Sequence, residues 1–321
     1  MLNTAMNIDN KEFIHVSVMP EEIGNWLQPR EGGTYLDATL GFGGHTYEIL
    51  KRSNLNCRII AMDLDSEAIN YSRKFLSDYT DKITFINRNF SQIDEVADSL
   101  GLEKFDGIVA DLGMSSYQID RSGKGFSFMK NEYLDMRMDQ TSKVTAFNIV
   151  NNSSFDELVR IFKEYGEERF ATRIAAEIIR TRESGDIRLA THLAGIVEKS
   201  IPAKFHPKNI HPATRVFQAL RIIVNNELEN LEIFIEKAVS MLNPGSRIAV
   251  ISFHSIEDRI VKNKFRSYSE NCICPPELPV CGCGKKQELK LLTRKSVKPS
   301  HVEIDINRRS RSARLRVAER I

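Results

Sequence analysis

The segment from Tyr35 to His45 constrains the fold most, because it reads as a short apolar strand, a glycine-rich turn and the start of a helix. Gly41, Gly43 and Gly44 carry no Cβ, so the backbone can take positive φ there and lie close to a ligand at the carboxyl end of the strand. Such a turn is typical of nucleotide-type cofactor sites, but ordinary strand-to-helix packing also uses glycines. The turn therefore predicts a cofactor site only with support from other residues.

Asp63 provides that support. It directly follows the apolar segment Arg58 to Met62 and lies 19 residues beyond Gly44. In dinucleotide-type sites an acidic side chain about 20 residues after the glycines holds the ribose hydroxyls. The pair of features predicts that Asp63 binds a ribose.

The alternation of apolar strands and helices predicts an α/β fold with a parallel sheet. Three aspartates, Asp37, Asp63 and Asp111, lie at the carboxyl ends of predicted strands. In a parallel sheet the carboxyl ends meet at one crevice, so these carboxylates can converge on one ligand. The predicted strands are Thr34 to Ala38, Arg58 to Met62, Ile83 to Ile86, Asp106 to Asp111 and Arg247 to Ser252, with Leu289 to Thr293 and Ala313 to Val317 as closing, mutually antiparallel strands.

Between about Thr141 and Pro212 the pattern changes to helical periodicity without strand alternation. Ser154 and Glu157 have the spacing of a capping box at the start of an amphipathic helix. We predict a sheet domain in two parts, residues 1–140 and 213–321, with an all-helical domain inserted at 141–212. The second part carries a basic C-terminal segment.

Charge and hydropathy indicate the compartment and the partner. No apolar run approaches the roughly 18 to 20 residues of a membrane span, and the first eleven residues do not resemble a signal peptide, so we expect a cytoplasmic protein without a membrane partner.

From Lys285 to Ile321 there are twelve Lys or Arg against four Asp or Glu, in a chain whose total net charge is +2. The basic segment predicts a polyanionic partner, with a solvated surface as the alternative.

Four of the five cysteines form a cluster, Cys272, Cys274, Cys281 and Cys283, while Cys57 reads as a buried strand residue. A cytoplasmic location argues against a disulfide knot, which leaves a zinc site or a redox-sensitive loop. The Cys-x-Cys spacing departs from the usual Cys-x(2–4)-Cys of zinc sites. The sequence alone therefore assigns no metal ligands.

The glycine turn leaves two classes of enzyme open, a dinucleotide-dependent oxidoreductase and a transferase that uses S-adenosylmethionine. A pyrophosphate seat usually has the spacing Gly-x-Gly-x-x-Gly. Gly41-Phe-Gly-Gly44 departs from it, which favours a single nucleoside with an amino-acid arm.

Six sequence blocks, in order over nearly the whole chain, resemble the bacterial ribosomal RNA small subunit methyltransferase H family, also called MraW. The blocks are Asp37-Ala-Thr-Leu-Gly-Phe-Gly-Gly-His45, Asp111-Leu-Gly-Met-Ser-Ser-Tyr-Gln-Ile-Asp120, Gly125-Phe-Ser-Phe128, Leu134-Asp-Met-Arg-Met-Asp139, His211-Pro-Ala-Thr-Arg-Val-Phe-Gln-Ala-Leu220 and Ser252-Phe-His-Ser-Ile-Glu-Asp258.

This resemblance implies methyl transfer from S-adenosylmethionine to the exocyclic N(4) of a cytosine in 16S ribosomal RNA, at the decoding centre. It implies a methyltransferase-type Rossmann sheet with a helical insert that recognises substrate, and the small ribosomal subunit as partner, with no DNA. The implied cofactor contacts are Gly43, Gly44, His45, Asp63, Phe90, Asp111 and Gln118.

A cytosine amine is a poor nucleophile, so it must be oriented toward the methyl group and must lose a proton. Asp111 and His254 are the candidates for this chemistry. Other amino-methyltransferases place Asp or Asn before Pro-Pro-aromatic, whereas this chain has Asp111-Leu-Gly-Met, which leaves the assignment open. A non-catalytic RNA-binding or ribosome-assembly factor that retains the cofactor fold is the alternative function.

A flipped base is usually held on aromatic faces. Phe126, Phe128 and Tyr133 are candidates for that contact, and packing against the helical insert is the alternative for all three.

Overall fold

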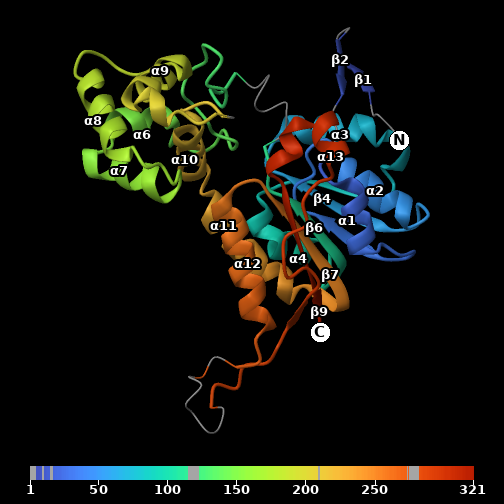
Figure 1. The fold of residues 1–321 in the computed structure, drawn as a ribbon. Coiled ribbons are helices and arrows are strands. Elements are labelled where there is room, and N and C mark those ends of the chain that lie inside the picture. Colours follow the sequence, from blue (N-terminus) through green and yellow to red (C-terminus); the bar gives the residue numbers. More distant parts are fainter. Residues whose placement is uncertain are drawn as a thin grey trace. The chain divides into compact units, whose positions relative to one another are not determined.

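The computed structural model describes residues 17–114, 123–208, 210–272, 274 and 282–321, together with the backbone of two short strands near the amino terminus. These strands, β1 (Ala5–Ile8) and β2 (Lys11–Ile14), form an antiparallel pair. The chain divides into two compact units, one made of Met1–Gly113 with Leu228–Ile321 and the other of Met114–Glu227 (Figure 1).

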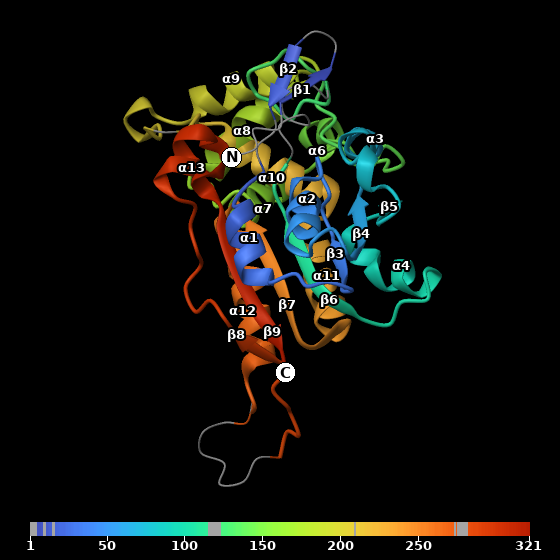
Figure 2. The same cartoon turned by 90° about the vertical axis from the view of Figure 1, so that its right-hand side faces the viewer.

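The first unit contains a seven-stranded sheet in the order β5-β4-β3-β6-β7-β9-β8. The five strands β5, β4, β3, β6 and β7 are parallel to one another, while β9 is antiparallel to both β7 and β8. Figure 2 shows β8 and β9 at the edge of the sheet opposite β5. The strand bounds are β3 (Thr34–Asp37), β4 (Arg58–Asp63), β5 (Ile83–Asn87), β6 (Phe105–Asp111), β7 (Leu242–Ser252), β8 (Leu289–Leu291) and β9 (Arg314–Arg320).

Helices cover both faces of this sheet because alternate strand residues point to opposite sides. Leu36 and Ile60 pack in the core beneath α4, α11 and α12, whereas Tyr35 and Ile59 pack in the core beneath α1, α2 and α3. The helix bounds are α1 (Pro20–Leu27), α2 (Gly44–Arg52), α3 (Ser66–Phe75), α4 (Ile93–Ser99), α11 (Glu227–Ser240), α12 (Ser255–Ser269) and α13 (His301–Ile306), with the short 3-10 turns η1 (Ser77–Tyr79), η2 (Phe90–Gln92) and η4 (Arg308–Ser312).

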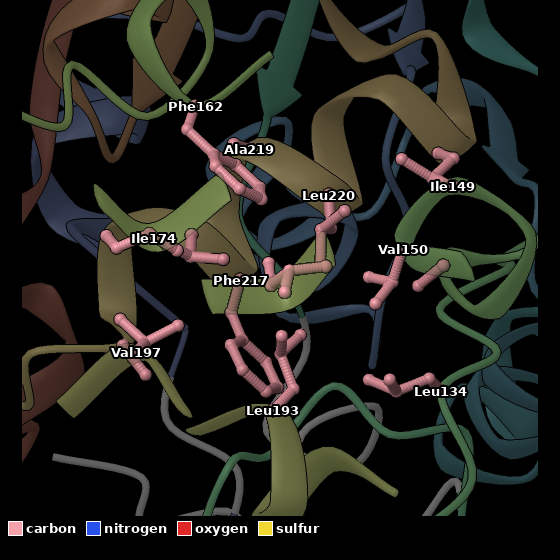
Figure 3. Packing of buried hydrophobic residues seen from close by; sticks show 14 of the residues in the cluster. Leu134, Ile149, Val150, Phe162, Ile174, Leu193, Val197, Phe217, Ala219 and Leu220 are labelled. Carbon is pink, nitrogen blue, oxygen red and sulfur yellow. The ribbon is translucent and has the colours of Figure 1, made fainter. Parts of the chain in front are cut away.

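The second unit is helical and has its own apolar core (Figure 3). Phe162 of α7 is fully buried, and it belongs to the same cluster of buried residues as Ile174 of α8, Val197 of α9 and Leu220 of α10. The bounds are α6 (Ala146–Asn152), α7 (Phe155–Glu164), α8 (Ala171–Arg182), α9 (Ala190–Ser200), η3 (Ala203–Phe205) and α10 (Thr214–Asn225).

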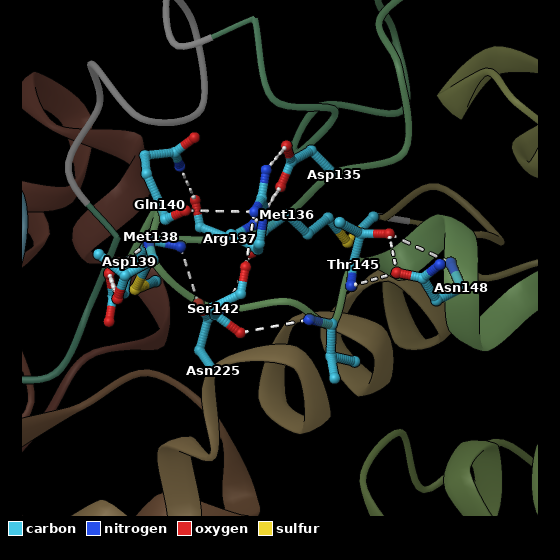
Figure 4. Close-up of polar contacts among 12 residues, drawn as sticks. Asp135, Met136, Arg137, Met138, Asp139, Gln140, Ser142, Thr145, Asn148 and Asn225 are labelled. Carbon is cyan, nitrogen blue, oxygen red and sulfur yellow. Dashed lines mark hydrogen bonds and ion pairs between the residues drawn. The ribbon is translucent and has the colours of Figure 1, made fainter.

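The loop before α6 is held by polar contacts (Figure 4). Arg137 donates from Nε and Nη2 to the two carboxylate oxygens of Asp135 at 2.7 and 2.9 Å, and the guanidinium holds the pKa of Asp135 down against the effect of its burial. Asn225 of α10 donates to the carbonyl of Met136 and accepts from the amide of Met138, both at 2.8 Å. The Leu134 to Asp139 block is therefore part of the structural frame of the helical unit.

The parallel strands and the two antiparallel closing strands agree with the sequence prediction, as does the cap of α7, where Ser154 accepts from the amide of Glu157 at 3.2 Å. β7 begins at Leu242, five residues earlier than predicted. The helical unit is wider than the predicted insertion at 141–212. Leu134 on one side and Val216 on the other are buried in the same core, so the unit includes them.

No helix of the described residues is long and apolar enough to cross a membrane.

We expect Phe162→Ala to lower the stability of the helical unit by about 3–5 kcal/mol, because truncating a buried aromatic side chain leaves a cavity. Phe155→Ala, on the same helix, is the matched control, because Phe155 is 39% exposed. Urea denaturation with hydrogen exchange of the α7 and α8 amides measures both variants. Equal losses in the two variants would contradict the packing of α7 described above.

Candidate active site

The glycine turn connects the end of β3 to α2. Gly43 takes φ of 83° at the N-cap of α2, and its amide donates to the carbonyl of Leu40 at 2.8 Å. A Cβ added to Gly44 would lie 1.7 Å from Oγ of Ser17. The turn therefore requires glycine for its backbone conformation at Gly43 and for space at Gly44.

Asp63, at the end of β4, holds the turn in place. Its Oδ2 accepts from the amide of Gly41 and its Oδ1 accepts from the amide of Asp65, both at 2.8 Å. Burial raises the pKa of Asp63 to about 6, although these two hydrogen bonds oppose the shift. Each carboxylate oxygen retains acceptor capacity, so Asp63 can still accept hydrogen bonds from two hydroxyls.

Asp37 and Thr39 connect β3 to its neighbours. Asp37 is fully buried and accepts from Oγ1 of Thr46 at 2.8 Å, and burial raises its pKa. Oγ1 of Thr39 accepts from the amide of Asp111 at 2.6 Å. The Thr39 contact fixes the end of β6 beside the glycine turn, at the point where the strand order reverses direction.

His45 and Asp111 meet across this point. Nε2 of His45 lies 3.3 Å from Oδ2 of Asp111, and the His45 side chain is 5% exposed. Burial opposes a charge on His45, but the hydrogen bond to Asp111 and the charges of Asp111 and Asp37 outweigh it and raise the pKa of His45. Nδ1 of His45 and Oδ1 of Asp111 are buried without a hydrogen-bond partner among the described residues. These two atoms are suited to a ligand with one donor and one acceptor.

Glu303 of α13 is a member of the site that the sequence analysis missed. Its Oε1 accepts from the amide of Met19 at 2.7 Å, and burial raises its pKa. Its charge contributes to the raised pKa of His45, more than 250 residues earlier in the chain. The sequence signals only a helix start here, Ser300 followed by Glu303, and Ser300 indeed caps α13.

Two other predicted site residues lie at carboxyl ends of the sheet. Phe90 begins η2 after β5, with its ring edge-to-face against Phe234 at 5.3 Å between centroids. His254 follows β7 and forms a capping box with Glu257 at the start of α12. Nδ1 of His254 accepts from the amide of Glu257 at 3.4 Å, and Nε2 lies 3.0 Å from Oε1 of Glu257. These contacts give His254 a structural role, and its catalytic role stays a prediction, while Gln118 lies outside the described residues.

The three aromatic candidates all belong to the helical unit. Phe126 is buried in its core, and Phe128 stacks on His211 at 4.6 Å between centroids. Tyr133 stacks on Phe147 but is 44% exposed. Only Tyr133, among these three, has an open surface for a base.

The sheet order, the antiparallel β9 and the acid at the end of β4 define an α/β enzyme of the methyltransferase type, with a Rossmann-like sheet and an inserted helical region. The family model described as "MraW methylase family" matches residues 12–321. The ribosomal RNA small subunit methyltransferase H of Clostridium botulinum (strain Loch Maree / Type A3) is 46% identical over 310 residues, which cover 97% of this chain and 100% of the relative. That of Carboxydothermus hydrogenoformans is 48% identical over 97% of this chain and 99% of the relative.

The chain belongs to the MraW methylase family. The expected family, fold class and enzyme class are thus confirmed. Among solved structures, a putative rRNA-methylase from Clostridium thermocellum aligns with 96% of this chain and 100% of its own at 13% identity and a TM-score of 0.46.

We expect Gly44→Ala to destabilise the sheet unit by about 1–3 kcal/mol, because the new methyl group would overlap Ser17. The double variant Gly44→Ala with Ser17→Gly removes the overlapping atoms and should recover most of that loss. Thermal unfolding of the two variants and of Ser17→Gly alone forms a double-mutant cycle. Additive effects without recovery would contradict the close approach of Ser17 to the turn.

Proposed function

We propose that this protein transfers a methyl group from S-adenosylmethionine to the exocyclic N(4) of a cytosine in 16S ribosomal RNA. Membership of the MraW methylase family and the substrate in the names of its relatives support this proposal. The observation that carries the cofactor assignment is a pair of buried atoms, Nδ1 of His45 and Oδ1 of Asp111, for which the described residues provide no hydrogen-bond partner.

The site residues fit S-adenosylmethionine. A protonated amine would donate to Oδ1 of Asp111, and a carboxylate would accept from Nδ1–H of His45, whose raised pKa favours the protonated ring. Gly43 and Gly44 leave room for this amino-acid arm, Asp63 would hold the ribose hydroxyls, and Phe90 would lie near the adenine. We retain Gln118 as a further proposed contact.

The electrostatics of the site also suit a ligand with positive charge. Asp37, Asp63 and Glu303 all have raised pKa values, with burial as the main cause. A sulfonium cation nearby would favour their ionised forms and reduce the cost of burying them. When bound, S-adenosylmethionine supplies an electrophilic methyl group on that sulfonium.

Methyl transfer requires the cytosine amine to lie in line with the carbon–sulfur bond. The N(4) lone pair forms the new carbon–nitrogen bond, the electron pair of the broken bond stays on sulfur, and N(4) loses one proton. The lone pair is delocalised into the ring, so orientation of the amine contributes most to the rate. Asp111 is fixed at the strand end by Thr39 and His45, and a lone pair that His45 and the cofactor's amine leave free would orient the cytosine amine and accept its proton, with His254 as the second proposed candidate.

The basic C-terminal segment divides into paired and exposed residues. Arg316 is buried and bidentate to Asp258, at 2.7 and 3.0 Å, and Arg320 pairs with Glu288 at 2.6 Å, so both stabilise the fold. Arg308 and Arg311 of η4 are exposed. These exposed arginines are the proposed contacts to RNA phosphates, and Tyr133 in the helical unit is the proposed contact to a base.

Labelled S-adenosylmethionine and small ribosomal subunits that lack this modification test the activity. We expect label in a single cytosine of 16S ribosomal RNA, and we expect Asp111→Asn to lower kcat/KM by about 10²-fold or more. Asp98→Asn, an exposed position on α4, is the matched control and should keep the wild-type rate.

Label in protein or in adenine, or an unchanged rate for Asp111→Asn, would contradict the proposal. A role as a non-catalytic assembly factor is tested in cells with Asp63→Ala. If this variant no longer binds the cofactor but still supports normal subunit assembly and growth, the binding role is favoured.

Cofactor affinity should depend on the ionisation of Asp63. Ribose hydroxyls donate to the carboxylate form of Asp63, whose pKa is about 6. Below that pH the cofactor affinity should rise by up to about tenfold per pH unit, and above it the affinity should level off. In Asp63→Asn this step should disappear and binding at pH 8 should weaken. Calorimetric titration of both proteins between pH 5 and 8 separates this step from the titration of His45, which both retain. Identical profiles for the two proteins would refute the assignment of Asp63.

A further inference from the structure

Cys272 and Cys283 lie close together although they are eleven positions apart in the sequence. Cys272 follows the end of α12 and Cys283 precedes β8, so both lie in the loop that connects these two elements, called the cysteine loop below. Hydrogen bonds join the residues at the two ends of this loop. The amide of Glu288 donates to the carbonyl of Tyr268 at 2.8 Å, and Oε2 of Glu288 accepts from Arg320 of β9 at 2.6 Å. The cysteine loop is therefore attached at both ends to the folded sheet unit.

The geometry of the thiols matches metal coordination. Sγ of Cys272 lies 3.8 Å from Sγ of Cys283, and the Sγ atoms of Cys272, Cys274 and Cys283 all lie within 4.8 Å of one another. Zinc–sulfur bonds of about 2.3 Å in a tetrahedron separate the sulfurs by about 3.8 Å. A disulfide would bring two sulfurs to about 2 Å. A single cation can thus bind all three thiols with small movements of their side chains.

The backbone around Cys272 contacts its sulfur directly. The amide of Cys274 donates to Sγ of Cys272 at 3.3 Å, so this part of the loop orients the sulfur. Lys285 and Lys286 closely follow Cys283, so the local sequence charge is positive and would offset part of the negative charge that metal-bound thiolates bring together.

The thiols are separate from the methyl-transfer site. The active site lies at the carboxyl ends of β3, β4 and β6, and α12 starts after the carboxyl end of β7. The 15 residues of α12 span about 22 Å and run back along the sheet, away from the carboxyl ends of the parallel strands. The cysteine loop begins at the far end of this helix (Figures 1 and 2). A metal here would connect α12 to β8 and would have a structural role.

We propose that Cys272, Cys274 and Cys283 bind one divalent cation that prefers thiolates, namely zinc, and that this ion stabilises the loop between α12 and β8. Tetrahedral zinc has a fourth position, which the described residues do not assign. Cys281 lies outside the described residues and is not part of the proposed site. The alternative from the sequence analysis, a redox-sensitive loop, becomes an outcome of the test.

The test uses the full-length protein without a polyhistidine tag, purified under reducing conditions and never exposed to a chelator. After incubation with excess zinc and gel filtration, elemental analysis should find about one zinc per chain. The double variant Cys272→Ser with Cys283→Ser should retain less than about a tenth of that amount. Cys57→Ala is the matched control, because Cys57 is buried directly before β4 and lies outside the cluster, and it should keep the wild-type zinc content.

A second measurement does not depend on the variants. Cobalt added to the metal-free wild-type protein should produce an intense thiolate-to-cobalt charge-transfer band in the near ultraviolet, and removal of zinc should lower the thermal midpoint of the wild type but not of the double variant. Less than about half an equivalent of zinc in the reduced wild type, or absence of the cobalt band, would overturn the proposal. So would a Cys272–Cys283 disulfide in freshly purified, metal-free protein. Each result is independent of methyltransferase activity.

Discussion

The contact between His45 and Asp111 joins the first residues of α2 to the end of β6, and the geometry of the candidate active site depends on it. It bridges the point where the sheet order reverses, with β3 on one side and β6 on the other. The hydroxyl of Thr39 accepts a hydrogen bond from the amide of Asp111. The carboxylate of Asp63 accepts one from the amide of Gly41 and so holds the glycine turn that positions His45. Nδ1 of His45 and Oδ1 of Asp111, which have no hydrogen-bond partner within the described part of the chain, are therefore held in position before any ligand binds.

The buried acids around this contact make the site favour a ligand that carries positive charge. Burial raises the pKa values of Asp37, Asp63 and Glu303, so ionising all three without a counter-charge is unfavourable. A sulfonium cofactor supplies positive charge that its demethylated product lacks. The same electrostatics that support donor binding should thus hold the product less tightly.

The sequence predicted those parts of the protein that have local signals. The glycine turn, Asp63 at its characteristic spacing and the apolar strands depend on nearby residues, and the structure contains all of them. Glu303 could not be found in this way, because only tertiary folding brings α13 to His45. The sequence could not assign α10 to the core of the helical unit either, since the helical periodicity of α10 does not tell which core the helix packs into. His254 and Glu257 are only three residues apart, but histidine is not among the preferred N-cap residues, so the sequence analysis did not predict the capping box that they form.

A crystal structure of the protein with S-adenosylmethionine or its demethylated product tests the central claim most directly. The account predicts the ligand's amino group within hydrogen-bond distance of Oδ1 of Asp111, its carboxylate at Nδ1 of His45, and its ribose hydroxyls at Asp63. A ligand whose amino-acid arm leaves both buried atoms of His45 and Asp111 without partners would contradict it.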